Sequence, residues 1–190
     1  MHIAVTGAAG RIGRYVVRDL LAAGHSVQGI DAVAGSGLQV DLTDVGQVYG
    51  ALAGADAVVH MGAWANAGMV PDVRTYGDNT AGTYNVFQAC ADLGVRRVVS
   101  ASSNQVYGFF SAPPLYAPID EAHPTRPVNS YALSKLAGEQ AAEYFSRTRG
   151  MEILSFRIMG ARVPSELPGD IAQIKSDEGA ATKLLWTRSD

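Results

Sequence analysis

The sequence has a single cysteine, little charge of either sign and no long apolar run. The cysteine, Cys90, cannot form a disulfide within the chain. A helix that crosses a membrane needs about 18 or more consecutive apolar residues, and no such run occurs. Nothing before the first predicted strand resembles a signal peptide. We therefore expect a cytoplasmic protein without a membrane partner.

Basic residues are scarce as well. The chain has 15 Lys and Arg residues against 18 Asp and Glu residues, for a net charge of −3. The pair Arg96-Arg97 is too short to form a basic patch, so we expect no nucleic-acid partner. We also predict no metal site. With 190 residues, 47% of them hydrophobic, the chain can bury one good core.

Hydrophobic periodicity alternates between strand and helix along the chain. The predicted strands cover residues 2–6, 26–30, 38–40, 56–60, 96–101 and 152–157. The predicted helices cover residues 11–23, 44–53, 79–93 and 130–148. This alternation predicts an α/β fold with a doubly wound parallel sheet, the Rossmann fold, over residues 1–158. The proline-rich stretch 104–129 is predicted to be a loop that flanks a substrate.

Three glycines follow the first strand directly. Gly7, Gly10 and Gly13 lie between a buried strand and a helix whose apolar residues recur at helical spacing. Here Gly7 suits a tight turn, Gly10 the close approach of a pyrophosphate, and Gly13 the packing of helix on strand. The N–H groups at the start of the helix would then face the phosphates. The alternative is an ordinary glycine-rich turn.

Asp31 ends the second predicted strand, 18 residues beyond Gly13. An acidic side chain at this distance can accept hydrogen bonds from the adenosine ribose hydroxyls, and it would repel a 2′-phosphate. No lysine or arginine occurs in residues 32–37. We therefore predict NAD rather than NADP as the cofactor. The alternative is that Asp31 is a solvated loop carboxylate.

Tyr131 and Lys135 are four residues apart, so they share one face of the predicted helix. A free tyrosine has a pKa near ~10, too high for a base at neutral pH. In a partly buried site a cation at ~4 Å would stabilise the phenolate by roughly 4 kcal/mol, equivalent to about three pKa units. We therefore predict that Lys135 lowers the pKa of Tyr131 and makes it a proton-transfer group. The alternative is a lysine that merely covers the ring.

Hydroxyl groups collect at the end of the fifth predicted strand. Ser102 and Ser103 follow an apolar run, at the strand end where open α/β sheets bind ligands. Taken alone, the two serines would more often belong to a turn or a helix cap. Together with Tyr131 and Lys135 they complete a Ser, Tyr, Lys set.

These segments resemble the extended branch of the short-chain dehydrogenase/reductase superfamily, the NAD-dependent epimerase/dehydratase family. In the family's order, the matching segments are 6–13, 31, 41–42, 60–63, 79–86, 102–108 and 131–135. They cover nearly everything up to Arg157. The resemblance implies that Ser103 is the catalytic serine and Tyr131 the acid/base. It also implies that Lys135 holds the nicotinamide ribose.

The same resemblance implies where NAD would bind. Asp41 and Leu42 would meet the adenine, and Ala63 and Asn79 would line the path to the nicotinamide. The complete predicted cofactor site is Gly7, Gly10, Arg11, Ile12, Gly13, Asp31, Asp41, Leu42, Ala63, Asn79, Tyr131 and Lys135.

The substrate is less clearly indicated. Family members that act on nucleotide sugars commonly have an asparagine shortly after the arginine of the last core strand, and none follows Arg157 here. Residues 102–110 instead resemble a segment of uronate dehydrogenases, which oxidise a free sugar acid and release NADH. In that case Asn104 and Gln105 would bond sugar hydroxyls, beside Ser103 and Tyr131, and Arg162 would meet a carboxylate. The alternative for Asn104, Gln105 and Arg162 is a surface or supporting role.

Three functions remain open. The favoured one is an epimerase/dehydratase-type enzyme that acts on a hydroxyl of a sugar or nucleotide sugar. The second is a uronate-type sugar dehydrogenase that releases NADH. The third is a truncated, non-catalytic NAD-binding module. Release of NADH with turnover separates the second from the first, and binding without turnover identifies the third.

Only 33 residues follow Arg157, so the resemblance implies a shortened substrate-binding region over 159–190. A loop with a short helix is predicted over 164–172 and one more strand over 183–187. The resemblance also implies a homodimer formed through helices 79–93 and 130–148. Apolar rows suit that contact, although they could face only the sheet. The rows are Tyr84, Phe87 and Ala91, and Leu133, Leu136 and Gln140.

Overall fold

A computed structural model describes the chain except residues 36, 110, 162–164, 167, 170 and 172–190. Over the described residues the sheet has six parallel strands in the order β3-β2-β1-β4-β5-β6. The strands are β1 His2–Thr6, β2 Ser26–Asp31, β3 Leu38–Gln39, β4 Ala57–His60, β5 Arg97–Ser103 and β6 Glu152–Ile158. The helices are α1 Gly13–Ala22, α2 Val45–Leu52, α3 Asp72–Leu93 and α4 Ser130–Arg149. The predicted doubly wound α/β fold is confirmed.

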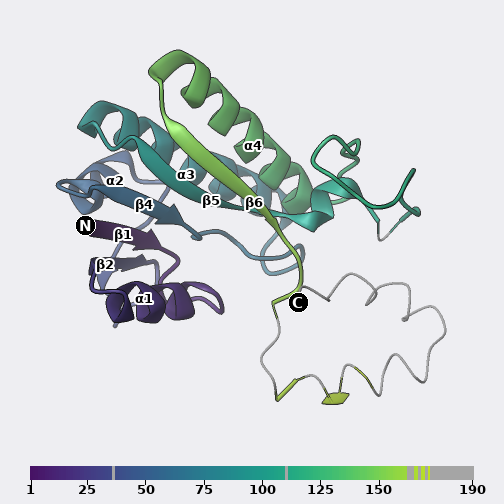
Figure 1. Cartoon of the computed structure of the whole chain (residues 1–190), viewed down its shortest axis with the longest axis horizontal. Helices are drawn as coiled ribbons and strands as arrows, with labels where there is room; N and C mark the ends of the chain where they lie inside the picture. Colours follow the sequence, from purple (N-terminus) through teal and green to yellow (C-terminus); the bar gives the residue numbers. More distant parts are fainter. Residues whose placement is uncertain (36, 110, 162–164, 167, 170, 172–190) are drawn as a thin grey trace.

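The helices form a layer on each face of the sheet (Figure 1). Helices α2, α3 and α4 cover one face, and α1 lies on the other, beside β1 and β2. The larger core lies under the first group and contains the fully buried Phe87 and Phe145. A smaller core lies under α1, where Ile3 and Val5 meet Leu20. Burial of both cores holds the strand ends in register.

The order of the strands reverses between β1 and β4, and this reversal locates the ligand crevice. Strand β1 pairs with β2 on one side and with β4 on the other. The connections that leave β1 and β4 therefore diverge, and they open a crevice at the carboxyl ends of the strands. The glycine loop after β1, residues 61–71 after β4 and residues 104–129 after β5 all leave the sheet at this edge.

Helix α3 begins earlier than the predicted residue 79. It begins at Asp72, directly after Pro71, and ends at Gly94 in a left-handed conformation. Proline cannot continue a helix from its N-terminal side, whereas an acidic residue in the first turn stabilises the helix dipole. The added turns are polar and partly exposed, so their sequence carries little apolar periodicity.

The predicted loop 104–129 is packed around aromatic rings. It begins with a short 3-10 helix, η1 Asn104–Tyr107. Tyr107 stacks on Phe109 with ring centroids 5.0 Å apart, and both rings contact the edge of buried His123. The His123 Nε2 atom accepts a hydrogen bond from the Leu115 N–H at 3.0 Å. The loop is therefore held in place by packing and hydrogen bonding beside the end of β5.

One of the two predicted dimer rows is wrong as a single surface. Tyr84 is exposed, but Phe87 is fully buried against the sheet. Positions 84 and 87 lie about 60° apart around the helix, since each residue adds about 100°. The row therefore crosses the boundary between the exposed face and the buried face of the helix. The predicted strand 183–187 lies outside the described residues, as do residues 164, 167, 170 and 172 of the predicted element 164–172. In the described part of the chain, the helices are all too short or too polar to cross a membrane.

Candidate active site

The glycine loop after β1 is held by backbone-to-backbone packing. Gly7 has a φ of +69°, which favours glycine, and its carbonyl accepts the Gly10 N–H at 3.0 Å to close the turn. A Cβ on Gly7 would lie 2.7 Å from the Gly62 nitrogen, and one on Gly13 would lie 2.0 Å from the Gly7 carbonyl oxygen. Larger residues would push the loop, α1 and the β4 connection apart. The turn role of Gly7 and the packing role of Gly13 are thus seen directly.

The start of α1 fits a phosphate-bearing cofactor. Ile12 occupies the N-cap position, and no side chain caps the first N–H groups of the helix. Uncapped N–H groups and the helix dipole favour an anion at this end. Arg11, predicted to contact the cofactor, forms an ion pair with Glu166 at 2.8 Å and donates to the Ala161 carbonyl. Arg11 therefore joins the loop to the segment that follows β6.

Asp31 lies against the glycine loop. Its Oδ2 atom accepts a hydrogen bond from the Ala9 N–H at 2.9 Å, and its Oδ1 atom accepts one from the Val33 N–H at 3.1 Å. A carboxylate has about four acceptor positions, so two remain for ribose hydroxyls. The position of Asp31, next to the start of α1, therefore fits an adenosine ribose.

The predicted adenine contacts have different environments. Asp41 accepts hydrogen bonds from the N–H and the hydroxyl of Thr43, both at 2.8 Å, and stays exposed. Leu42 packs over two glycines: a Cβ on Gly62 would lie 2.7 Å from Leu42 Cδ1, and a Cβ on Gly82 would lie 2.9 Å from Leu42 Cβ. Asp41 is thus accessible to a ligand, whereas Leu42 also belongs to the packing between β4 and α3.

A buried polar chain joins the ends of β1 and β4, and the sequence patterns did not reveal it. The Thr6 hydroxyl accepts N–H groups of Met61 and Gly62, so its proton goes to His60 Nδ1 at 2.8 Å. His60 Nε2 then carries a proton and donates to the Thr83 hydroxyl at 3.0 Å. Burial lowers the pKa of His60 to about 3, so the imidazole is neutral. In the sequence, the feature that could have indicated this buried chain was His60, a histidine at the end of an apolar strand.

Ser103, Tyr131 and Lys135 come together at the edge of the sheet. Ser103 ends β5, Tyr131 lies in the first turn of α4, and Lys135 lies one turn later. All three side chains are buried, and the Ser103 and Tyr131 hydroxyls share a hydrogen bond. The first turn of α4 is fixed by its N-cap, since Asn129 Oδ1 accepts the Ala132 N–H at 2.8 Å. The predicted Ser, Tyr, Lys set is therefore one structural unit.

The predicted effect of Lys135 on Tyr131 is wrong for this structure. Burial raises the pKa of Tyr131, and only the hydrogen bond with Ser103 acts in the opposite direction. Lys135 Nζ lies 5.7 Å from the centre of the tyrosine ring and donates to the Ala101 carbonyl at 2.8 Å. Burial also lowers the pKa of Lys135 to about 8. The ammonium faces the end of β5, so loss of solvent decides the direction of the tyrosine shift.

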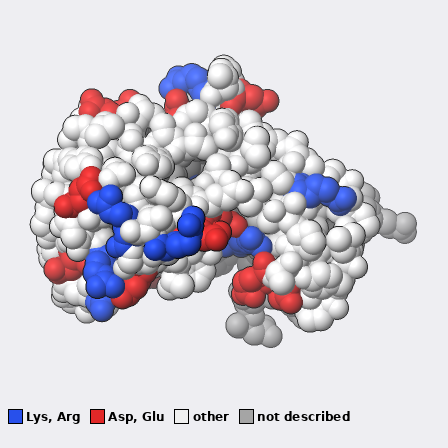
Figure 2. All heavy atoms as spheres, turned by 90° about the horizontal axis from the view of Figure 1, so that it is seen from above, with Lys and Arg blue, Asp and Glu red and all other residues white. Residues whose placement is uncertain are grey.

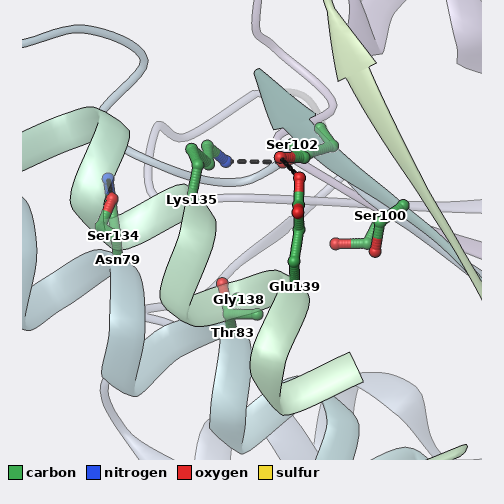
Figure 3. A pocket seen from close by; sticks show the side chains of 10 residues that line it. Asn79, Thr83, Ser100, Ser102, Ser134, Lys135, Gly138 and Glu139 are labelled. Carbon is green, nitrogen blue, oxygen red and sulfur yellow. Dashed lines mark hydrogen bonds between the residues drawn. The ribbon is translucent and has the colours of Figure 1, made fainter. Parts of the chain in front are cut away.

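A polar cavity lies beside Lys135, between α3, α4, residues 100–102 of β5 and the middle of β6 (Figure 3). It has room for about one water molecule. Ser102 lines this cavity, and its hydroxyl donates a hydrogen bond to Glu139. Glu139 also accepts two hydrogen bonds from Arg157, at 2.9 and 2.8 Å. Glu139 was not predicted, because its partner is distant in sequence.

The remaining predicted residues differ in their partners. Asn79 is buried and fully bonded, since it contacts both backbone groups of Trp64 and the Ser134 hydroxyl. It therefore holds the half-buried Ala63 segment against α4. Gln105 bonds two other amides, whereas the Asn104 side chain has no hydrogen bond to another described residue. Arg162 lies outside the described residues.

Acidic and basic side chains are interspersed between broad uncharged areas on the face seen in Figure 2. The predicted ligand contacts that the structure describes are the glycine loop, Asp31 and the Ser, Tyr, Lys unit. Together with the sheet order, these features define a dinucleotide-binding protein of the short-chain dehydrogenase type. Residues 3–186 match the model of the NAD dependent epimerase/dehydratase family, and the chain belongs to this family.

Curated relatives include sugar dehydrogenases and sugar-nucleotide epimerases. L-arabinose 1-dehydrogenase (NAD(P)(+)) of Haloferax volcanii is 34% identical over 83% of this chain and 66% of its own length. Uronate dehydrogenase of Pseudomonas putida is 32% identical over 83% and 60%, respectively. UDP-glucose 4-epimerase of Lacticaseibacillus casei is 30% identical over 83% and 50%. The chain thus spans between half and two thirds of these relatives.

Solved structures agree with this assignment. A short-chain dehydrogenase/reductase superfamily protein from Agrobacterium tumefaciens with bound NAD superposes with a TM-score of 0.82. It is 32% identical, and the match covers 100% of this chain and 63% of that protein. UDP-glucose 4-epimerase of Thermus thermophilus in complex with NAD has a TM-score of 0.70 and 29% identity, over 83% and 54%. NAD is therefore the cofactor that the family and the site indicate.

Proposed function

We propose that this chain oxidises a hydroxyl group of a sugar, as an NAD-dependent dehydrogenase that releases NADH. The observation that carries the proposal is the burial of Ser103, Tyr131 and Lys135 together at the end of β5, with Lys135 one helical turn after Tyr131. The two curated relatives described above with the highest identities are an arabinose and a uronate dehydrogenase, which supports a free sugar as the substrate.

Residues of the chain divide the chemistry between them. NAD would supply the hydride acceptor for the carbon that carries the reacting hydroxyl. The uncapped start of α1 and Asp31 would hold the dinucleotide, and Lys135 would hold its nicotinamide ribose. Ser103 donates a hydrogen bond to the substrate oxygen. Tyr131 exchanges the proton of that oxygen.

The raised pKa of Tyr131 affects the transfer of the proton from the sugar hydroxyl. Burial raises the pKa of Tyr131, so the phenol is protonated at neutral pH in the protein without ligands. A protonated phenol supplies a proton when a carbonyl is reduced, whereas sugar oxidation requires the phenolate. We therefore expect the rate of oxidation to rise with pH above neutrality.

A panel of sugars tests the proposal. The full chain is incubated with NAD and, separately, D-galacturonate, D-glucuronate, L-arabinose and UDP-glucose, and NADH is followed by absorbance. Net NADH from a free sugar supports a dehydrogenase. Conversion of UDP-glucose to UDP-galactose without NADH identifies the second candidate, an epimerase, which the relatives of 30% identity favour. Binding of NAD with no turnover of any sugar identifies a non-catalytic module and refutes the proposal.

We also propose that the chain forms a homodimer through the outer faces of α3 and α4. These two helices pack on each other, and Tyr84, Leu133 and Tyr144 are each about half exposed there. Sedimentation that shows only monomer at micromolar concentration would contradict the dimer. The division into residues 1–158 and 159–190 and the cytoplasmic location stay predictions.

A further inference from the structure

Three side-chain amides form a continuous chain across the loops at the ligand-binding edge. Asn129 Nδ2 donates to Gln105 Oε1 at 3.1 Å, and Gln105 Nε2 donates to Asn66 Oδ1 at 3.3 Å. Asn129 is the N-cap of α4, Gln105 lies in η1, and Asn66 lies between β4 and α3. The chain of amides therefore joins the connection after β4 to both ends of the connection that follows β5, residues 104–129.

The orientation of every amide in this chain is determined from one end. Asn129 Oδ1 accepts the Ala132 N–H, so the Asn129 amino group must face Gln105. Gln105 then presents its oxygen to Asn129 and its amino group to Asn66. Asn66 Oδ1 accepts from Gln105 and also from the Ala67 N–H at 3.0 Å. The Asn66 amino group is consequently left pointing away from both partners, with no hydrogen bond to another described residue.

The position of this amino group relates it to the reacting groups. Gln105 follows Ser103 by two residues, and Asn129 precedes Tyr131 by two residues. The bond between Gln105 and Asn129 thus ties together the segments that carry the two hydroxyls. Asn66 forms the exposed end of the chain of amides, whereas Gln105 and Asn129 are half-buried or better. The Asn66 amino group is a hydrogen-bond donor whose orientation is fixed by Gln105 and Ala67, and it lies at the exposed end of the chain of amides. Such a donor is suited to an acceptor atom on a ligand.

We propose that Asn66 donates a hydrogen bond from Nδ2 to an oxygen atom of the sugar, and that Gln105 and Asn129 position it. This inference rests on the proposed function and deepens it. It changes the role expected for Gln105 from a sugar contact to a positioning residue, because both ends of its amide are already bonded. The acceptor is a hydroxyl or carboxylate oxygen, which both uronates and neutral sugars carry.

The first test compares substitutions of Asn66 in the full chain, with D-galacturonate, L-arabinose or UDP-glucose as the probe, whichever the wild type turns over. Asn66→Ala should raise KM for the sugar about tenfold, the equivalent of one lost hydrogen bond of ~1.4 kcal/mol, with kcat changed less than threefold. Asn66→Asp can accept but cannot donate, so it should raise KM at least as much as Asn66→Ala. The Kd for NAD should stay within about twofold in both variants.

The second test concerns positioning. Gln105→Glu still accepts from Asn129 but cannot donate to Asn66, so it should raise KM toward the Asn66→Ala value. The double variant should show little further loss, because both changes remove the same contact. Gln88→Ala removes an amide from the side of α3 toward α2, where its partner Asp92 also accepts a hydrogen bond from Tyr49, and serves as the control with unchanged KM.

The outcomes separate this inference from the proposed function. An active wild type with unchanged KM in Asn66→Ala overturns the sugar contact alone. Tighter binding by Asn66→Asp than by Asn66→Ala overturns the donor assignment, because it identifies a donor on the sugar. A wild type that binds NAD but turns over no sugar overturns both the proposed function and the inference.

Discussion

The ion pair between Glu139 and Arg157 should be the most sensitive polar contact in the described part of the fold. Two hydrogen bonds of 2.8 and 2.9 Å join the carboxylate to the guanidinium, and Glu139 also accepts a hydrogen bond from Ser102. The side chains are only 15% and 21% exposed. Arg157 further donates to the Tyr107 hydroxyl at 2.9 Å. The pair thus connects α4, β6 and the end of β5, where Ser102 is its contact.

The expected loss follows from what Glu139→Gln leaves behind. Removing one partner of a fully buried ion pair costs about 3–5 kcal/mol, because the remaining charge has no counterion. Here the pair is partly exposed, glutamine keeps one acceptor, and Arg157 keeps its bond to Tyr107, so we expect about 2 kcal/mol. With a urea m-value of ~2 kcal/mol/M, the midpoint of unfolding should fall by roughly 1 M.

Glu152→Gln provides the matched control. Glu152 pairs with Arg97 at 3.4 Å on the surface, and both side chains are more than 60% exposed. Removal of such a pair should cost less than about 0.5 kcal/mol. Urea unfolding of the three proteins, followed by circular dichroism, gives both differences. Equal midpoints for Glu139→Gln and Glu152→Gln would refute the reasoning, because burial would then have no influence on the pair.

Two further predictions concern His60 and Asp31. The pKa of His60 is about 3 in the folded protein against an ordinary value of 6.5. As the pH falls, His60 therefore becomes protonated in the unfolded chain before it does so in the folded protein. Stability should fall by up to ~1.4 kcal/mol per pH unit as the pH drops below about 6, and His60→Gln should reduce this slope between pH ~6 and ~4.5. Identical slopes in urea unfolding would contradict the assignment. Asp31 should make NAD bind at least tenfold tighter than NADP, a difference in binding free energy of about 1.4 kcal/mol. Asp31→Ala should reduce this difference in affinity. Equal affinities of the wild type in calorimetry would show that Asp31 does not select the cofactor.

Much of the fold could be predicted because its signals are local. Apolar runs and helical spacing predicted the strands and helices close to their observed bounds, except for the polar start of α3, since each pattern lies within one element. The glycine loop was predictable for a similar reason: a tight turn and a close packing contact leave space only for glycine at Gly7 and Gly13. The meeting of Ser103 with Tyr131 followed from the parallel sheet, which brings strand ends to one edge.

The properties that could not be predicted depend on tertiary packing. The pKa of Tyr131 follows from its burial and from the direction of the Lys135 ammonium, and a spacing of four residues determines neither. The pairing of Glu139 with Arg157 joins a helix to a strand across a sequence separation of 18 residues. The amide chain through Gln105 links the connection after β4 to both ends of the connection after β5. Partners of this kind become neighbours only after the sheet has formed.

The most direct test of the account is hydride transfer in Tyr131→Phe. NADH formation is measured for the wild type and the variant at saturating NAD, with a sugar that the wild type is shown to oxidise. We predict a loss of roughly a thousandfold in kcat, an unchanged Kd for NAD, and a wild-type rate that rises with pH above neutrality. A variant that keeps near-normal turnover would contradict the assignment of Tyr131 as the group that moves the substrate proton.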